Sequence, residues 1–544
     1  MNARWNELRF GVISSRGSVA TWQAKAIREL LVSGNVRFAL SIVVPEARDS
    51  SPSALYRLYE RLLRCAALRK VDSRADVAGV PQLRCRVEQR DGAVRIASAN
   101  VDEIRHYDLD FILDFSDAGI SGGVVNAARL GVWRLLFSGR DGGPPGFWEI
   151  YDDDPITSVA LVRSRAEGDE LVLKQAAFPT RRHSPAKHVD RVLFESGKWP
   201  ARVCRELLAG TDLCTTTSPT PRWLSRYPGN GEMLRFGLRL LRNVLVWGYR
   251  GLFRHDVWTV ALADAPIHEF LRPAFAPTIR PLRSPSKRYL ADPFAIRRGD
   301  RLSVLCEDFD IATFRGVIAE IDIGADGTQG EPRPVLKSPF HLSYPCTVEH
   351  EGRLYCIPEA IGSGEIALYE LDSNGAGARK AATLVRAVPG ADPTLFRHGD
   401  LWWLAYALDD HGSMMDLHLW YSTSLLGPYR PHRLNPVKQD VRSSRPAGTP
   451  FEHQGVLYRP AQDCSVGYGS RVVVCRVERL TPNEFHEEPV AVVGPFASRG
   501  LSEGVHTLAS AGSVTLLDGR RSSFISSIFL RRLSRGMRGL PEAS

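Results

Sequence analysis

The sequence predicts a multidomain protein in which a basic helical connector joins an α/β domain to a five-bladed β-propeller. Three observations lead to this prediction. Strand-like and helix-like segments alternate over about the first 180 residues, positive charge is concentrated in the middle, and one short motif recurs five times near the C-terminus. We place the domains at residues 1–182, 183–256 and 257–520, followed by a basic tail at 521–544.

The N-terminal segment has the alternation of a doubly wound parallel sheet. An apolar run at 8–15 predicts a buried strand, and helical spacing at 19–34 ends in Gly34. A second strand and helix follow, as parallel sheets with crossover helices require. Two apolar segments at 156–164 and 170–180 predict antiparallel strands that finish the domain.

Positive charge belongs to one segment of the chain. The 544 residues carry a net charge of +9, and the segment from Arg181 to Leu290 holds 19 Lys and Arg against 8 Asp and Glu. The rest of the chain is therefore close to neutral. This distribution favours a local anionic partner such as lipid headgroups and argues against a general nucleic-acid binder.

A basic amphipathic helix is predicted at 232–256. Apolar residues at helical spacing form one stripe: Leu234, Leu238, Leu241, Leu245, Tyr249 and Leu252. Five arginines interrupt the segment too often for a membrane span: Arg235, Arg239, Arg242, Arg250 and Arg254. Such a helix can lie on an anionic membrane surface. The alternative is an interdomain helix that packs its stripe against both domains while the arginines reach solvent. Residues 522–539 repeat the pattern weakly.

The recurring motif is a β-hairpin in which a small residue or proline precedes two apolar strands and a Gly-centred turn. Aligned on Asp292, Pro345, Asp392, Pro446 and His506, the copies lie 53, 47, 54 and 60 residues apart. A period near fifty with one hairpin per unit is typical of a propeller blade, so five copies predict five blades. The apolar segment 257–267 reads as a strand that closes the ring.

The first strand of each blade lines the central channel of a propeller. Asp292 and Asp392 occupy corresponding positions in two copies, so we expect them to share one pocket. The alternative is that each Asp-Pro pair only makes a turn. Two copies at the same position favour the shared pocket.

The N-terminal domain resembles the formyltransferase family through LDFILDFS, AARLGVWRLLFSG, GGPPGFWEI, DDDPITSVALV and LVLKQAAFPT. The resemblance implies an Asn and a His two residues apart, but these positions hold Arg134 and Leu136. The implied third residue, an Asp, corresponds to Asp169, and the only histidine before residue 183 is His106. Formyl transfer needs a positioned base. We therefore expect a domain that kept the fold and lost the reaction, with formyltetrahydrofolate as cofactor only if it is active.

The C-terminal motifs LADPF, HLSYPCTVEHEGRLYCIPEA, ADPTLF, SSRPAGTPF, YRPAQDCSVGYG and GVHT resemble two groups. These are glycoside hydrolase family 43 and the N-terminal domain of plant glucosamine inositolphosphorylceramide transferases. The first implies three catalytic carboxylates. Asp292 matches the base, Asp392 the residue that tunes pKa, and Glu359 is the substitute for the acid, with Glu307 the weaker choice, because the expected position reads SSRPAG.

Further residues around these carboxylates are the polar and aromatic types that sugar pockets use. We expect a ligand to contact Tyr344, Arg445, Gln462, Asp463 and His506, and no metal ion. A guanidinium at Arg445 would suit an anionic group on that ligand.

The function predicted from these residues belongs to glycan metabolism, with a carbohydrate or glycolipid ligand and no nucleic acid. An active sugar N-formyltransferase and a family-43-like glycosidase are the alternatives, and transferase activity is favoured over hydrolysis. Nine cysteines without a CxxC pair, no secretory leader and no apolar run of about 18 residues predict a cytoplasmic protein. A peripheral membrane location is the alternative.

Overall fold

The computed structural model describes residues 5–15, 19–32, 34–45, 52–71, 79–90, 93–116, 120–137, 145–164, 170–210, 216–217, 227–298, 301–324, 326–372, 375, 377–408, 414–498 and 500–535. The chain divides into two compact units, Met1–Val244 and Leu245–Ser544. The multidomain, mostly sheet organisation is confirmed. Residues 183–256, expected as one connector, are divided between the two units.

The first unit contains an eight-stranded sheet of order β13-β12-β11-β10-β8-β1-β3-β5. Five strands are parallel: β1 (Leu8–Ser15), β3 (Val36–Val44), β5 (Gln82–Arg84), β8 (Phe111–Asp114) and β10 (Val132–Phe137). Three continue the sheet in antiparallel fashion: β11 (Ile156–Ser164), β12 (Glu170–Pro179) and β13 (Thr216–Thr217). The strand and helix alternation in the sequence predicts this combination.

An aromatic row crosses four neighbouring parallel strands. Phe38, Phe10, Phe111 and Trp133 stack in that order, with ring centroids 4.9, 5.5 and 4.1 Å apart. All four side chains are buried. Stacked rings on adjacent strands fix the register, since a slip by one residue would turn each ring to the opposite face.

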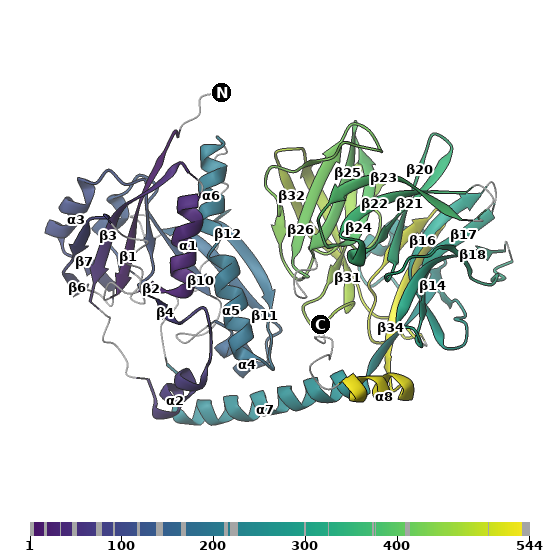
Figure 1. Cartoon of the computed structure of the whole chain (residues 1–544), viewed down its shortest axis with the longest axis horizontal. Coiled ribbons are helices and arrows are strands. Elements are labelled where there is room, and N and C mark those ends of the chain that lie inside the picture. Colours follow the sequence, from purple (N-terminus) through teal and green to yellow (C-terminus); the bar gives the residue numbers. More distant parts are fainter. Residues whose placement is uncertain are drawn as a thin grey trace. The chain divides into compact units, whose positions relative to one another are not determined.

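Helices and short hairpins cover this sheet (Figure 1). The helices are α1 (Thr21–Val32), α2 (Ala54–Leu62), α3 (Ser98–Arg105), α4 (Phe147–Asp152), α5 (Pro185–Ser196), α6 (Trp199–Leu208) and η1 (Gly123–Asn126). The short strands are β2 (Val19–Ala20), β4 (Lys70–Val71), β6 (Val87–Arg90), β7 (Ala93–Ile96) and β9 (Ile120–Ser121). Helix α1 packs against α5 and α6, so the first part of the expected connector belongs to this unit.

The positions that the formyltransferase resemblance assigns to catalysis carry no base. Arg134 and Leu136 lie on β10, and Arg134 forms an ion pair with Glu170. His106 is exposed after α3, and Asp169 lies outside the described residues. The imidazole of His188 is fully buried, and its Nε2 is 2.9 Å from Thr157 Oγ1. Burial lowers its pKa to about 3, so it is neutral and structural.

Among its described residues, the second unit holds five antiparallel sheets. The first is β16 (Arg288–Arg298), β17 (Arg301–Asp310), β18 (Arg315–Ile323) and β19 (Arg333–Leu336). The second is β20 (Ser343–His350), β21 (Arg353–Glu359), β22 (Glu365–Leu371) and β23 (Ala378–Arg386). The third is β24 (Gly390–His398), β25 (Leu401–Leu408), β26 (Asp416–Ser422), β27 (Arg430–Pro431) and β28 (Lys438–Gln439). The fourth is β29 (Phe451–His453), β30 (Val456–Asp463), β31 (Arg471–Leu480) and β32 (Phe485–Val493).

The fifth sheet joins the two ends of the second unit. It has the order β15-β14-β34-β33, from β14 (His255–Ala263), β15 (Ile279–Pro281), β33 (Leu508–Ala511) and β34 (Val514–Ser523). Strand β14 pairs with β34 along its whole length, from His255 opposite Ser523 to Ala263 opposite Thr515. The segment expected to close the ring therefore pairs with the last strand of the unit. The 3-10 turns η2 (Ile267–Leu271) and η3 (Ile361–Ser363) lie between strands.

Helix α7 (Asn230–Phe253) and helix α8 (Ser526–Arg535) carry the two basic apolar segments. The stripe expected on α7 is exposed at Leu234, Leu238, Leu241, Leu245 and Tyr249. No helix in the described part of the chain is sufficiently long and apolar to cross a bilayer.

We expect Gly448→Ala to destabilise the second unit far more than Gly352→Ala. Both glycines have positive φ, 132° and 72°, which costs a residue with a Cβ about 1–2 kcal/mol. A Cβ at Gly448 would lie 2.0 Å from the Leu508 carbonyl oxygen, whereas Gly352 has open space around it. Overpacking adds about 1–3 kcal/mol at Gly448 alone. Denaturant unfolding of the full chain measures the loss of stability in each variant. Equal losses would contradict the close approach of Gly448 to Leu508.

Candidate functional site

Five buried side chains lie on or just before the first strand of each repeat in the second unit, three of them on β16, β20 and β24 and two in the segments before β29 and β33. They are Asp292, Tyr344, Asp392, Arg445 and His506, and we call them the ring residues. Their relative exposures are 4%, 0%, 2%, 8% and 2%, so four ionisable groups and a phenol are buried together. The motif alignment on Pro345 and Pro446 was wrong by one residue, because in those copies the equivalent side chain precedes the proline.

A β-bulge presents the first three ring residues. Asp292-Pro293, Tyr344-Pro345 and Asp392-Pro393 each insert an extra residue into the innermost strand. Asp292, Tyr344 and Asp392 have φ values of 52°, 44° and 47°, which non-glycine residues seldom adopt. Such bulges re-aim a side chain and release a backbone N–H from the strand ladder. The Asp-Pro pairs therefore make a local turn and also direct the carboxylates of Asp292 and Asp392 toward the other ring residues.

Carboxylates on neighbouring sheets accept these released N–H groups. Asp518 Oδ2 accepts from the Asp292 N–H at 2.8 Å, and Asp292 Oδ2 accepts from the Tyr344 N–H at 3.1 Å. Glu359 Oε2 accepts from the Asp392 N–H at 2.8 Å. An unpaired buried N–H would cost about 1–3 kcal/mol, so each carboxylate stabilises the contact between two sheets.

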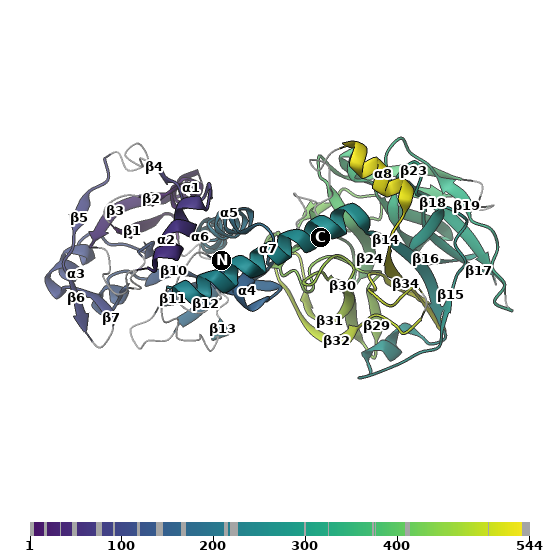
Figure 2. The same cartoon turned by 90° about the horizontal axis from the view of Figure 1, so that it is seen from below.

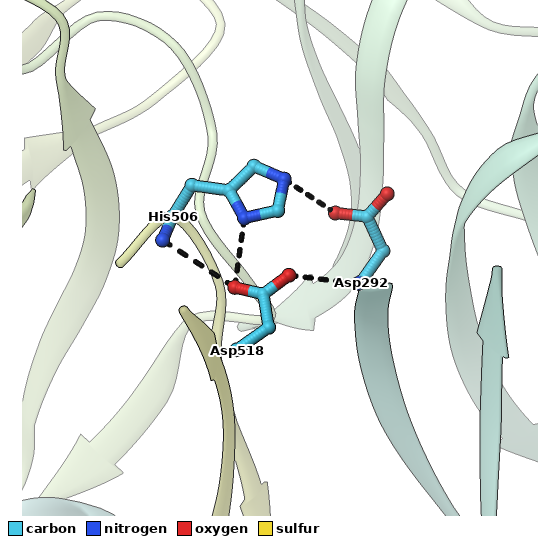
Figure 3. Close-up of side chains that lie close together, drawn as sticks. All are labelled: Asp292, His506 and Asp518. Carbon is cyan, nitrogen blue, oxygen red and sulfur yellow. Dashed lines mark hydrogen bonds and ion pairs between the residues drawn. The ribbon is translucent and has the colours of Figure 1, made fainter. Parts of the chain in front are cut away.

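A buried imidazole lies between two of these carboxylates (Figure 3). His506 Nδ1 is 2.7 Å from Asp518 Oδ1, and His506 Nε2 is 3.1 Å from Asp292 Oδ1. Thr507 donates from its hydroxyl to Asp292 Oδ1 at 3.1 Å. The indole of Trp258 stacks on the imidazole with ring centroids 3.8 Å apart.

The two carboxylates keep His506 protonated. Burial alone would lower the pKa of His506, but the charges of Asp518 and Asp292 outweigh it and raise the pKa to about 10. Burial also raises the pKa of Asp292, yet the His506 charge and the hydrogen bonds hold it below its usual value. Although the three residues offer ligand atoms within 4.8 Å of one another, an imidazolium has no lone pair for a metal ion. We therefore assign the cluster to a buried ion triad.

Asp392, Arg445 and Glu359 form a second buried ion cluster. Arg445 Nε and Nη2 lie 2.5 and 3.3 Å from the two oxygens of Asp392, and Nη2 lies 3.6 Å from Glu359 Oε2. The Gln462 amide donates to Asp392 Oδ2 at 2.6 Å. Burial raises the pKa of Asp392 to about 7, although Arg445 opposes the shift. Two acids therefore already surround the Arg445 guanidinium.

Glu307 lies beside the ion triad without such compensation. It is 6% exposed and stands opposite Ala291, next to the bulge. His341 Nε2 lies 3.5 Å from Glu307 Oε1, and that imidazole is 43% exposed. Burial, and then the charge of Asp292, raise the pKa of Glu307 well above its usual value. Glu307, with a raised pKa, thus lies beside Asp292, whose pKa is lowered, and contacts the partly exposed His341.

The structure brings seven of the eight predicted site residues into hydrogen-bonded contact with one another: Asp292, Tyr344, Glu359, Asp392, Arg445, Gln462 and His506. Tyr344 connects the two clusters, since its N–H donates to Asp292 and its hydroxyl lies 2.9 Å from Thr394 Oγ1. Asp463 differs, because its described partners are the Ser465 N–H at 2.9 Å and Arg471 at 3.2 Å. Trp402 and Trp403, two aromatic side chains of β25, are both buried in apolar cores.

Sequence reasoning missed Asp518, Thr507, Trp258 and His341, and gave Glu307 a minor place. Asp518 lies on β34 within the fifth repeat, and the hairpin of β33 and β34 brings it to His506. Trp258 lies on β14, far from the repeats in sequence. Tyr468 stands over the Arg445 guanidinium at 4.9 Å from its ring centroid and is half-buried. Only an alternation count of the hairpin strands could have indicated Glu307 and Asp518.

We expect His506→Gln to destabilise the second unit by about 3–5 kcal/mol, because Asp292 and Asp518 lose their buried counter-charge. His486→Gln is the matched control, since its ion pair with Glu478 is exposed and contributes under about 1 kcal/mol. Denaturant unfolding of both variants measures the difference. A loss no larger than the control's would contradict the ion triad.

The stabilisation from His506 should also depend on pH. The folded state holds the proton up to about pH 10, and the unfolded chain releases it near about pH 6.5. The contribution is therefore complete below about pH 6.5 and lost as pH rises through about 10. The difference in unfolding free energy between the wild type and His506→Gln should shrink over this range by roughly 1.4 kcal/mol per pH unit. A difference independent of pH would show that His506 is neutral.

Part of the second unit matches a family of known proteins. Residues 272–502 match the family model described as glucosamine inositolphosphorylceramide transferase 1, N-terminal. Glucosamine inositolphosphorylceramide transferase 1 from Oryza sativa subsp. japonica is 33% identical over 250 residues, which cover 43% of this chain and 33% of that protein. The Arabidopsis thaliana protein of the same name is 32% identical over 254 residues, or 43% and 32% of the two chains. This chain thus spans about a third of the length of the curated relatives it matches.

Similar solved structures come from two groups. A family 117 glycoside hydrolase from Zobellia galactanivorans has 13% identity and a TM-score of 0.30, covering 49% of this chain and 91% of that one. Glycinamide ribonucleotide transformylase 1 from Symbiobacterium toebii has 16% identity and a TM-score of 0.26, covering 38% and 89%. At these scores neither likeness carries an argument. The resemblance of residues 272–502 to the N-terminal domain of the glucosamine inositolphosphorylceramide transferases is confirmed.

Proposed function

We propose that residues 257–520 form a five-bladed propeller that recognises an amino sugar or a neutral sugar of a glycan or glycolipid. The observation that carries the proposal is the excess of acid among the buried central groups. Asp292, Glu307, Glu359, Asp392 and Asp518 supply five carboxyl groups, against the two cations Arg445 and His506. Five sheets, each with one ring residue at the start of its repeat, support the count of five blades.

The charge of the cluster suits an ammonium or hydroxyl ligand better than an anionic one. Even with Glu307 protonated, carboxylates outnumber cations at the centre. A phosphate or uronate would meet this excess negative charge, whereas a protonated amine would reduce it. The matched family's name, glucosamine inositolphosphorylceramide transferase, contains both an amino sugar and a ceramide lipid. Recognition of an amino sugar by this chain is consistent with that name.

Recognition is favoured over hydrolysis because the expected catalytic carboxylates already have protein partners. Asp292 accepts from Tyr344, Thr507 and His506, and both oxygens of Asp392 contact Arg445. A carboxylate held this way is a poor nucleophile or base until a partner moves. We propose a binding role in glycan transfer, with any catalytic partner outside these clusters.

One observation favours a family-43-like glycosidase as the second candidate. Glu307 and Asp292 are neighbouring acids whose pKa values are pushed apart, upward and downward from their usual ranges. Such a pair can divide acid and base roles. In that reaction Glu307 would give its proton to the leaving oxygen, and Asp292 would activate the attacking water.

We expect glucosamine to bind the full chain more tightly than N-acetylglucosamine, by about 10-fold near neutral pH, because only the first carries a positive charge. The variant Asp392→Asn should lose most of that preference. The control variant Asp463→Asn should keep it, because Asp463 lies outside the clusters. Isothermal titration with both sugars measures the affinities, and thermal unfolding checks that each variant is folded. No glucosamine binding, or equal weakening in the two variants, would overturn the proposal.

The preference should grow with pH. Asp392 gains its charge as pH rises through about 7, which strengthens attraction to an ammonium group. Affinity for glucosamine should therefore increase between about pH 5.5 and about pH 7.5, while the amine stays protonated. The slope should vanish in Asp392→Asn, and titrations across this range measure it. A slope that survives in the variant would assign the pH dependence to another group.

We expect Glu307→Gln and Asp292→Asn to decide the hydrolase alternative. If the chain hydrolyses an aryl glycoside, each variant should lose at least about a thousandfold in kcat, because a proton donor or a base is removed. His341→Gln serves as a control with a smaller effect. Absence of turnover in the wild type removes this alternative and leaves the binding proposal standing.

A further inference from the structure

Helix α7 has one apolar face that is buried against the first unit and another that is exposed. Met233 and Phe236 are buried, and Phe236 stacks on Phe147 with ring centroids 4.5 Å apart. The other face carries Leu234, Leu238, Leu241, Leu245 and Tyr249, whose relative exposures are 64%, 70%, 57%, 63% and 55%. We call these five residues the outer stripe. Leaving so many leucines in water is unfavourable, so a large exposed apolar patch indicates an interaction site.

Helix α8 lies beside the C-terminal end of α7 (Figure 2). The rings of Phe253 and Phe529 stack with centroids 5.2 Å apart, and Arg532 donates to the Arg254 carbonyl oxygen at 2.7 Å. Ile528, on the inner side of α8, is buried. The outer side of this segment exposes Phe524, Leu530 and Leu533 at 56%, 61% and 58%.

Arginine accompanies the outer stripe at a regular offset. Arg235, Arg239, Arg242 and Arg250 each follow a stripe residue by one position, which places them about 100° around the helix axis. Arg242 makes a long contact of 3.4 Å with Asp153, while Arg239 and Arg250 have no carboxylate partner among the described residues. Glu232 is the acid in the first turn, and the rest of α7 has none. Apolar and cationic groups are therefore interleaved along one side.

We propose that the outer stripe and α8 dock on the surface of an anionic lipid bilayer, with α7 lying parallel to the membrane plane. Leucines beside arginines match the two layers of such a surface, since the apolar groups enter the acyl boundary and the guanidinium groups bind phosphates. The arginines can reach the headgroups because their long stems lie along the apolar face. This inference does not rest on the proposed sugar binding.

A second copy of the chain fits this surface less well. The spacing of Leu234, Leu238, Leu241 and Leu245 would allow a coiled coil, but Gly248 interrupts the next position of the seam. Two copies would also bring arginines together without acids to pair them, and like charges repel. The additional apolar residues of α8 broaden the surface beyond a single seam. A flat anionic bilayer can pair with the arginines and can also cover the apolar residues of both helices.

The test is sedimentation of the full chain with vesicles. We expect strong binding to phosphatidylcholine vesicles with about 30% phosphatidylserine, and at least about 10-fold weaker binding to phosphatidylcholine alone. Replacing Leu238, Leu241 and Leu245 by Gln should weaken binding to the anionic vesicles by at least about 10-fold. The double variant Arg239→Gln/Arg250→Gln should do the same and reduce the dependence of binding on salt.

The matched control replaces three exposed apolar residues elsewhere in the second unit. Leu426, Val490 and Val492 are 51%, 43% and 60% exposed, and their replacement by Gln should leave vesicle binding unchanged. Circular dichroism and thermal unfolding confirm that each variant is folded. Failure of the wild type to bind anionic vesicles overturns the proposal, as does equal binding by the stripe variant. Concentration-dependent dimerisation without lipid, lost in the stripe variant, would assign the surface to a second copy instead.

Discussion

A backbone N–H that leaves its strand at a β-bulge and pairs with a carboxylate on the next sheet is the interaction on which the centre of the second unit depends. Asp518, Asp292 and Glu359 each accept such a bond. The bulges require positive φ at residues with a Cβ, a conformation that costs about 1–3 kcal/mol at each site. That strain persists because the carboxylates satisfy donors that would otherwise be buried and unpaired. Acids at the centre are thus required by the backbone before any ligand is considered.

Buried acids then require buried cations. His506 lies between Asp292 and Asp518, and Arg445 lies between Asp392 and Glu359. Removing one partner of such a pair leaves a charge without solvent or counter-ion, so the groups that would meet a ligand also hold the sheets together. Stability and recognition therefore share the same residues. Glu307 is the exception, because burial and the charge of Asp292 raise its pKa, and among the described residues it contacts His341 and not an arginine or lysine.

One apolar face of α7 is packed against the protein, and the other is exposed. Phe236 packs in the first unit, whereas Leu238 and Leu245 are left in contact with water. Helical periodicity predicted one broad apolar stripe and its arginines, but periodicity is the same for a stripe that packs internally and one that meets a membrane. Exposure in the folded chain distinguishes them. The sequence therefore indicated the helix, and only the packing identified which of its residues are available.

Local patterns in the sequence were sufficient for the elements and for most of the candidate site. Alternating apolar residues defined the strand at 8–15, the repeats separated the five hairpins, and Asp-Pro at 292 and 392 marked the start of two innermost strands, because these features depend on neighbours in the chain. The tertiary structure alone decided that Asp518 and Trp258 surround His506, that Asp392 neutralises Arg445 and that Asp463 turns away. The contacts of Trp258 with His506 and of Asp392 with Arg445 join residues far apart in sequence, whereas Asp518 reaches His506 within one hairpin. Their charges and pKa values follow from burial, which no local pattern records.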